Sequence, residues 1–66
     1  MDKPYIIVHD TSDGHVRTAH IFINNISAIT YQDGHTYIIL NNYNLEVDET
    51  PEDILEKISA ILNRID

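Results

Sequence analysis

The sequence predicts a single small α+β domain, in which an antiparallel β-meander of about four to five short strands is followed by one amphipathic C-terminal helix. Runs of β-branched and aromatic residues alternate with turn-forming residues over about residues 4–48. Two Asp-Gly pairs separate such runs, and apolar residues recur with helical spacing over about residues 51–65. A chain of 66 residues has room for one core only, so residues 1–66 form one domain.

The strands are expected at about residues 5–9, 15–23, 27–32, 36–40 and 45–48. Near the end of the second strand, apolar residues fall on both faces, which predicts that residues 21–23 lie at the centre of the sheet. Residues 45–48 alternate apolar and acidic side chains, as is typical of a short, half-exposed edge strand.

The turns are predicted from their residue types. Asp13-Gly14 and Asp33-Gly34 are typical of tight hairpins, because these residues adopt positive φ angles most readily. Asn41-Asn42-Tyr43-Asn44 predicts the next turn, since asparagine tolerates the left-handed region. Paired asparagines occur twice, at 24–25 and 41–42, and each pair comes after an expected strand that itself follows an Asp-Gly-His triplet. Two hairpins with the same turn chemistry explain this recurrence.

The helix has the clearest start signal in the chain. Thr50 is placed as the N-cap and Pro51 at the first helical position, and Glu52 and Asp53 follow in the first turn, where acids are favoured by the helix dipole. Apolar residues of the helix share one broad face that we expect to cover the sheet. They are Ile54, Leu55, Ile58, Ile61, Leu62 and Ile65.

Composition excludes several classes of function. Four Lys and Arg face eleven Asp and Glu, and a net charge of −7 disfavours general binding to nucleic acids. No apolar run is long enough to span a bilayer, and the N-terminus lacks the pattern of a signal peptide, so a cytoplasmic protein is expected. The absence of cysteine excludes disulfides and thiolate metal sites. So short a chain then depends on an efficient small core or on self-association for its stability, and we expect self-association to aid the core.

Catalytic and metal-binding constellations are not recognisable. The four histidines, His9, His15, His20 and His35, lack the spacing of metal ligands, although cross-strand pairing could bring some together. No serine stands in a glycine-flanked nucleophile elbow, and both glycines belong to Asp-Gly turns rather than to a phosphate-binding loop. We therefore expect no catalytic residues, no metal and no cofactor, and predict that the protein is not an enzyme.

Aromatic and acidic side chains are the candidates for a binding surface. Strand tyrosines pack in the core or across strands in most sheets, but tyrosines that share an exposed face offer a rigid contact area. The acidic residues of the last strand suit a basic partner, or serve only to protect a sheet edge. The candidate binding residues are Tyr31, Tyr37, Tyr43, Arg17, Glu46 and Asp48.

Several segments together resemble a known family. These are Tyr5-Ile6-Ile7-Val8, residues 23–29, residues 36–42, and residues 45–50 leading into Glu52-Asp53-Ile54. In these positions the chain resembles the small flagellar FlbD (SwrD-like) proteins and related short bacterial and phage proteins. The family has a glycine where this chain has Asn42-Tyr43, and a shorter first loop. The resemblance implies a small non-enzymatic accessory protein with a strand-rich body and a C-terminal helix.

The sequence supports two hypotheses about function. The first is a non-catalytic accessory module that forms a homo-oligomer and binds a protein partner. The second is a phage-type, anti-defence protein that either presents carboxylates to a basic enzyme or sequesters a small nucleotide. Glu46, Asp48, Glu49, Glu52 and Asp53 would serve the carboxylate mode, and Arg17 and Lys3 with neighbouring tyrosines the nucleotide mode.

Overall fold

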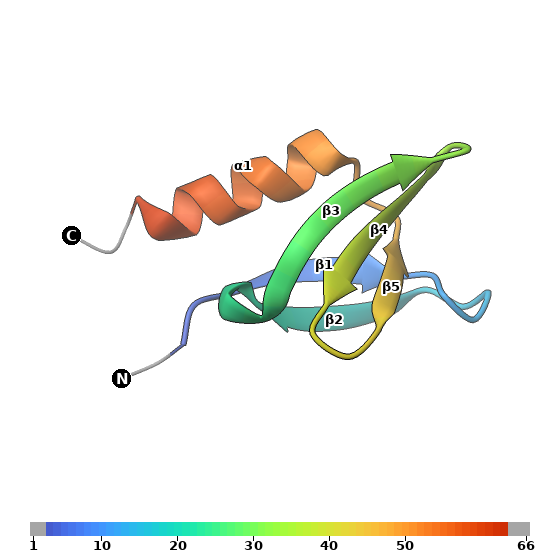
Figure 1. The fold of residues 1–66 in the computed structure, drawn as a ribbon, viewed down its shortest axis with the longest axis horizontal. Coiled ribbons are helices and arrows are strands. Elements are labelled where there is room, and N and C mark those ends of the chain that lie inside the picture. The colour runs from blue at the N-terminus through green and yellow to red at the C-terminus, as the bar shows by residue number, and fades with distance from the viewer. Residues whose placement is uncertain (1–2, 64–66) are drawn as a thin grey trace.

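The computed structural model describes residues 3–63 and has the expected α+β architecture. Five antiparallel strands precede one C-terminal helix (Figure 1). Among the described residues, no helix has the length and apolar character needed to cross a membrane. The elements are β1 (Tyr5–Asp10), β2 (Arg17–Phe22), a 3₁₀ turn η1 (Ile23–Asn25), β3 (Ile26–Gln32), β4 (His35–Leu40), β5 (Asn44–Val47) and α1 (Pro51–Leu62).

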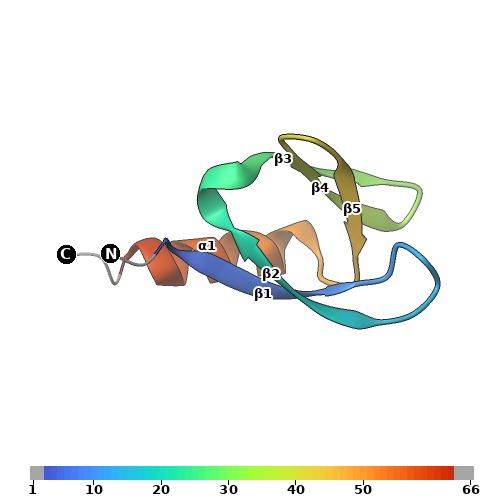
Figure 2. The ribbon, with the colours of Figure 1, turned by 90° about the horizontal axis from the view of Figure 1, so that it is seen from below.

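The sheet is divided into two arms that meet at a narrow joint. The strand order is β2-β1-β5-β4-β3, so the hairpin arm, β1 and β2, lies beside the three-stranded arm, β3 to β5. Six residue pairs join β1 to β2, but only Asp10 and Val47 are paired between β1 and β5. The two arms therefore diverge from this joint, and Figure 2 shows them separating from it.

This order corrects two predictions about the strands. The segment Ile21-Phe22 belongs to β2, which is an edge strand rather than the centre of the sheet, and Ile23 begins the 3₁₀ turn η1. Conversely, β5 lies in the centre of the sheet instead of at an edge, and both Leu45 and Val47 are buried. Alternation of apolar and acidic residues indicates a strand with one face on the core and one face in solvent. It does not indicate whether the strand lies at the edge or in the centre of the sheet.

The two Asp-Gly pairs have different outcomes. Asp33-Gly34 forms the predicted tight turn, but a tight hairpin at Asp13-Gly14 is wrong, because residues 11–16 separate the paired residues Asp10 and Arg17 and Asp13 does not have a positive φ. Asp33 and Gly34 have φ angles of 53° and 83°, and they connect the paired residues Gln32 and His35. Positive φ at both central residues is the geometry of the tight turn that matches the twist of a hairpin. Gly14 has a φ of 84° in the longer β1–β2 loop.

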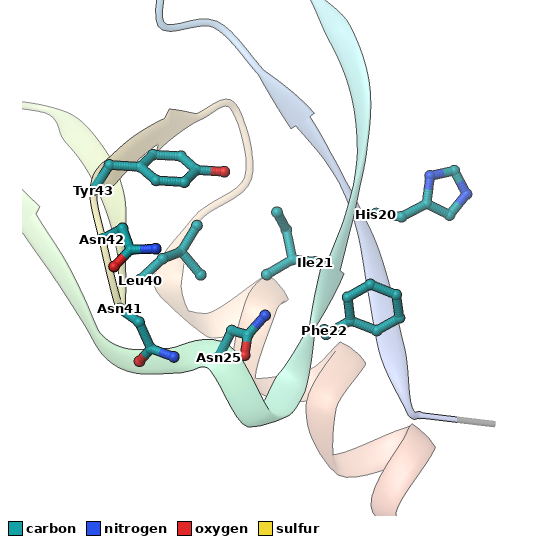
Figure 3. Close-up of a pocket in the computed structure, with 8 residues that line it drawn as sticks. All are labelled: His20, Ile21, Phe22, Asn25, Leu40, Asn41, Asn42 and Tyr43. Atoms are coloured by element: carbon teal, nitrogen blue, oxygen red, sulfur yellow. The ribbon is translucent and has the colours of Figure 1, made fainter. Parts of the chain in front are cut away.

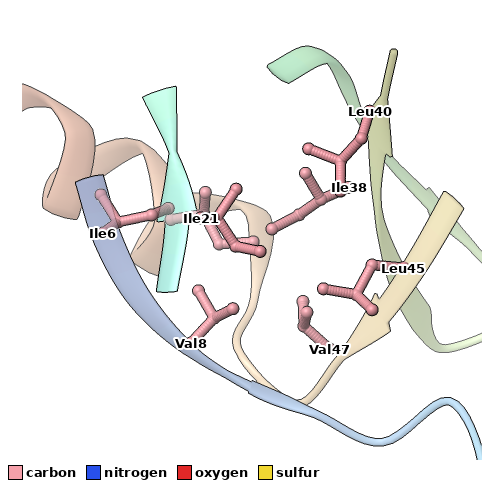
Figure 4. Close-up of a cluster of buried hydrophobic side chains, with 8 residues drawn as sticks. Ile6, Val8, Ile21, Ile38, Leu40, Leu45 and Val47 are labelled. Carbon is pink, nitrogen blue, oxygen red and sulfur yellow. The ribbon is translucent and has the colours of Figure 1, made fainter. Parts of the chain in front are cut away.

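The core fills the wedge between the two arms. Inward-facing side chains of β1 and β2 point toward those of β4 and β5 (Figure 4). Ile54 is fully buried in the same cluster, and α1 packs against both β1 and β3, so the helix bridges the arms. The buried apolar residues are Ile6, Val8, Ile21, Ile38, Leu40, Leu45, Val47 and Ile54.

The helix begins as predicted. The backbone N–H of Asp53 donates to the Thr50 hydroxyl at 3.1 Å, which confirms Thr50 as the N-cap, and Pro51 is the first helical residue. The helix is described as far as Leu62, and the prediction for Ile65 lies outside the described residues.

A carboxylate reinforces the joint between the arms. Glu49, just before the helix, accepts a hydrogen bond from the His9 backbone N–H at 3.0 Å, and its second oxygen lies 2.7 Å from His9 Nδ1. The Glu49 side chain is only 11% exposed. Burial raises the pKa of Glu49. This effect is outweighed by hydrogen bonds to the carboxylate from the backbone and ring of His9 and from the backbone of Glu49 itself, together with the charge of His9, so the pKa is lowered overall.

We predict that Glu49→Gln destabilises the protein at neutral pH by about 1–2 kcal/mol, because it weakens charge-assisted hydrogen bonds at the joint. Because the pKa is lowered in the folded state, the contribution of Glu49 to stability is fully present above the pKa of a free glutamate. It is lost progressively as the pH falls below that value and through the lowered pKa of the folded state. Urea unfolding of wild type and variant between about pH 7 and pH 3 measures this difference.

Glu56→Gln, on the exposed surface of α1, is the matched control and should change stability little at any of these pH values. A difference between wild type and Glu49→Gln that stays constant down to pH 3 would contradict a role for the ionised carboxylate.

Candidate functional site

A hollow lies between the arms at the end of β2. Its volume is about 310 Å³, at the lower end of the range for ligand pockets. Its walls come from the end of β2, from η1 and from the β4–β5 turn (Figure 3). The lining residues are His20, Ile21, Phe22, Asn25, Leu40, Asn41, Asn42 and Tyr43.

The floor of the hollow is apolar and continuous with the core. Ile21 and Leu40 are buried and project into the space between β2 and the β4–β5 turn (Figure 3). His20 and Phe22 point away from this space, so these two residues line the hollow with their backbone rather than with their rings. The β2 wall therefore consists of the Ile21 side chain and the backbone of residues 20 and 22.

Three amide side chains form the polar part of the rim. Asn25, Asn41 and Asn42 are exposed, and their amides make no hydrogen bond with any side chain or backbone group of residues 3–63. The turn itself is closed by a backbone hydrogen bond of 2.9 Å from the Leu40 N–H to the Tyr43 carbonyl. Each amide is free to offer both a donor and an acceptor to a ligand.

Backbone geometry does not explain these asparagines. The β4–β5 turn lies at the predicted residues, but the prediction that its asparagines adopt the left-handed region is wrong. Among the described residues other than glycine, only Asp33 has a positive φ angle, so Asn41 and Asn42 are not in the left-handed region. Other residue types could take this backbone without strain.

The predicted binding residues occupy several places. Tyr37 and Glu46 face each other across β4 and β5, and Glu46 also lies 2.8 Å from His35 Nδ1. Tyr31 is 62% exposed near the β3–β4 turn, whereas Tyr43 lines the hollow at the other end of β4. The remaining two are Arg17, which forms an ion pair with Asp13, and Asp48, which is exposed after β5.

Two of the histidines are occupied by structural partners. His9 and His35 each contact a carboxylate, Glu49 and Glu46, but neither ring has a Ser or Thr hydroxyl as a second partner within the described part of the chain. A nucleophile activated by histidine needs that contact. No three His, Asp or Glu residues among positions 3–63 lie close enough together to hold a metal ion.

An aromatic cluster covers the outer face of the hairpin arm. The Tyr5 ring lies 5.3 Å from the His20 ring and 6.2 Å from the Phe22 ring, in an edge-to-face arrangement with the latter. Ile7 is paired with His20 on the same face, and Tyr5, Ile7 and Phe22 are each more than 40% exposed. The apolar character of both faces of β2 thus comes from an exposed cluster on one side.

Comparisons of the chain with protein-family models, with curated proteins and with solved structures found no match. The resemblance to the flagellar FlbD (SwrD-like) proteins therefore stays a prediction. Any function proposed for this chain has to rest on its fold and on the side chains that the fold exposes.

Of the predicted binding residues, Tyr43 alone lines the hollow, and the asparagines beside it are not among them. The available signal was the recurrence of paired asparagines at 24–25 and 41–42. Local turn chemistry was a sufficient explanation for each pair on its own. Only the folded chain shows that Asn25 and Asn42, from different pairs, line the same hollow.

We predict that Asn42→Ala changes the free energy of unfolding by less than about 0.5 kcal/mol, because its amide forms no hydrogen bond within the described residues and its backbone does not require asparagine. Thermal and urea unfolding measure the change. A loss of more than about 1 kcal/mol would show that the amide is part of the fold instead of being free for a ligand.

Proposed function

We propose that this chain is a cytoplasmic, non-catalytic binding module that forms a homodimer through α1 and engages a protein partner. The observation that carries the proposal is an apolar seam along the helix, in which the half-buried Ile58 lies between the exposed Leu55 and Leu62. Leu55 and Leu62 are 57% and 50% exposed, although the sheet lies on the other flank of the helix.

The spacing of the seam fits a second helix. Leu55, Ile58 and Leu62 follow one another at intervals of three and four residues, the spacing of the a and d positions of a coiled coil. Ile54 and Ile61 face the core of the same chain, and the half-buried Ile58 lies between this stripe and the two exposed leucines. The helix is therefore apolar over a wider arc than its own sheet covers.

A second copy is the occupant that matches the seam best. An antiparallel pair with twofold symmetry would place Leu55 against Leu62 of the other copy and Ile58 against its counterpart near the axis. This arrangement also keeps the acidic first turns, with Glu52 and Asp53, at opposite ends of the interface and aligns the helix dipoles favourably. A parallel pair would bring those acids together.

The size and charge of the interface indicate a weak dimer. A helix of 12 residues is about 18 Å long, which is short for the roughly 800 Å² that each partner buries in a stable complex. Each copy carries a net charge of −7, so the copies repel each other at low salt. The dimer should dissociate on dilution and strengthen as salt screens the repulsion.

A second candidate function is the phage-type acidic inhibitor. Its support is the exposure of Asp48, Glu52 and Asp53, three carboxylates of the densest acidic stretch. Glu46 and Glu49 of that stretch are engaged with His35 and His9, which leaves a smaller acidic surface than the sequence predicts. In the nucleotide-sequestering form, Arg17 would have to leave Asp13, and no Lys or Arg of the described residues lines the hollow.

We predict that the wild-type protein is dimeric at about 100 µM in moderate salt, and that Leu55→Glu is monomeric under the same conditions, because the variant places a charge in the apolar seam. Light scattering coupled to size-exclusion chromatography measures the mass. Circular dichroism establishes that the monomeric variant is folded, which is expected because Leu55 is exposed in a single copy.

Ala60→Glu is the matched control. It adds the same charge to an exposed position on the opposite face of the same helix, and should leave the dimer intact. A wild-type chain that remains monomeric at about 100 µM in both low and high salt contradicts the proposed dimer. Equal effects of Leu55→Glu and Ala60→Glu would assign the loss of association to charge alone and exclude the seam.

A further inference from the structure

We propose that the hollow and the free edge of β2 together bind an extended, uncharged peptide segment of a partner protein, with basic residues flanking that segment. The segment would add to β2 as an antiparallel or parallel strand, and its far side would meet the asparagine amides across the hollow. This inference rests on the proposed function in one respect: it specifies how the protein partner is bound.

The first support is the position of β2. This strand pairs with β1 on one side and ends the sheet, so one edge of its backbone has no strand beside it among the described residues. The hollow runs along residues 20–22 of this strand. Free N–H and C=O groups on a sheet edge are the usual means by which a sheet captures an extended peptide.

The second support is the chemistry of the opposite wall. A peptide unit presents one donor and one acceptor, and an asparagine amide offers the complementary pair. Asn25, Asn41 and Asn42 are three such amides on one rim, all without hydrogen-bond partners within the described residues. The side of the peptide that faces away from β2 would therefore also find partners, which a bare sheet edge does not provide.

The third support is what lines the floor. Ile21 and Leu40 form an apolar base, next to the Tyr43 side chain, that suits one apolar side chain of the peptide. No Lys, Arg, Asp or Glu within residues 3–63 lines the hollow, so a charged group placed there would be desolvated without a counter-charge. This argues for a neutral peptide centre and against the phosphate of a nucleotide.

The charge of the whole chain defines the flanks. A net charge of −7 attracts basic segments and repels acidic ones over distances of about a Debye length. Electrostatic complementarity of this kind mainly raises the rate of association and discriminates among partners. A peptide with a neutral, strand-forming centre matches the uncharged lining of the hollow. Lys or Arg on either side of that centre matches the negative charge of the whole chain.

The test is a selection from a displayed library of random heptapeptides against the wild-type protein. We expect enrichment of sequences with alternating apolar residues, no central proline, and Lys or Arg at the ends. A synthetic copy of the best selected peptide is then titrated by isothermal calorimetry. The double variant Asn25→Ala/Asn42→Ala should bind it at least about tenfold more weakly, which corresponds to about 1.4 kcal/mol.

The chain contains a matched control for this variant. Asn24 and Asn44 are exposed neighbours of the same residue type that do not line the hollow. Asn24→Ala/Asn44→Ala should keep the affinity within about twofold of wild type. Amide shifts in the NMR spectrum of the wild-type protein should concentrate on residues 17–22 and 40–43 when the peptide is added.

Three outcomes would overturn the proposal. The first is that the wild-type protein enriches no peptides beyond those that the Asn25→Ala/Asn42→Ala variant enriches. The second is that the two double variants lose affinity for the selected peptide equally. The third is that the amide shifts caused by the peptide lie away from β2 and the β4–β5 turn.

Uridine serves as a probe for small neutral ligands. If uridine shifts the NMR signals of the amides around the hollow and the selected peptide does not, the site binds a small neutral ligand instead of a peptide. The two proposals can fail separately. A wild-type protein that is monomeric but binds the peptide keeps the site without the dimer, and a wild-type dimer that binds no peptide keeps the dimer without the site.

Discussion

The joint between β1 and β5 is the constraint on which the rest of the molecule depends. One residue pair, Asp10 with Val47, connects the two arms in the sheet. Beside it, the His9 carbonyl accepts a hydrogen bond of 2.9 Å from the Asp48 N–H, and the Thr11 N–H donates one of 3.0 Å to the Glu46 carbonyl. Because the arms touch so narrowly, they diverge into a wedge rather than a flat sheet. The wedge is what allows side chains from both arms to form one core.

The wedge also determines what is left exposed. The helix bridges β1 and β3, while the space between β2 and the β4–β5 turn remains open as the hollow. A domain of this size has too few residues to cover every apolar side chain, so Leu55, Leu62 and the Tyr5 cluster stay accessible to solvent. The same economy that limits the core thus provides the surfaces on which other molecules can dock.

Local features of the fold could be predicted from the sequence, and long-range pairing could not. The Asp33-Gly34 turn and the Thr50 cap depend on neighbouring residues, so their chemistry is visible in the sequence. The position of β5 depends on a partner strand some 40 residues away, and its alternating pattern is the same for an edge and a central strand. The edge position of β2 could not be predicted because Phe22 makes both faces of the strand apolar, although its side chain points outward and joins an exposed aromatic cluster. The candidate site was predicted only in part for the same reason, since Asn25 and Asn42 become neighbours only when η1 and the β4–β5 turn come together at the end of the wedge.

The narrow joint has a consequence for biosynthesis. The hairpins β1–β2, β3–β4 and β4–β5 each close over a few residues, whereas the β1–β5 joint must close a loop of about 40 residues. On the ribosome the hairpin arm emerges long before β5 exists, since chains grow from the N-terminus. Apart from Ile21, the core partners of Ile6 and Val8 are therefore missing until β4, β5 and α1 have been synthesised, and the apolar face of the nascent hairpin is open to aggregation during that time.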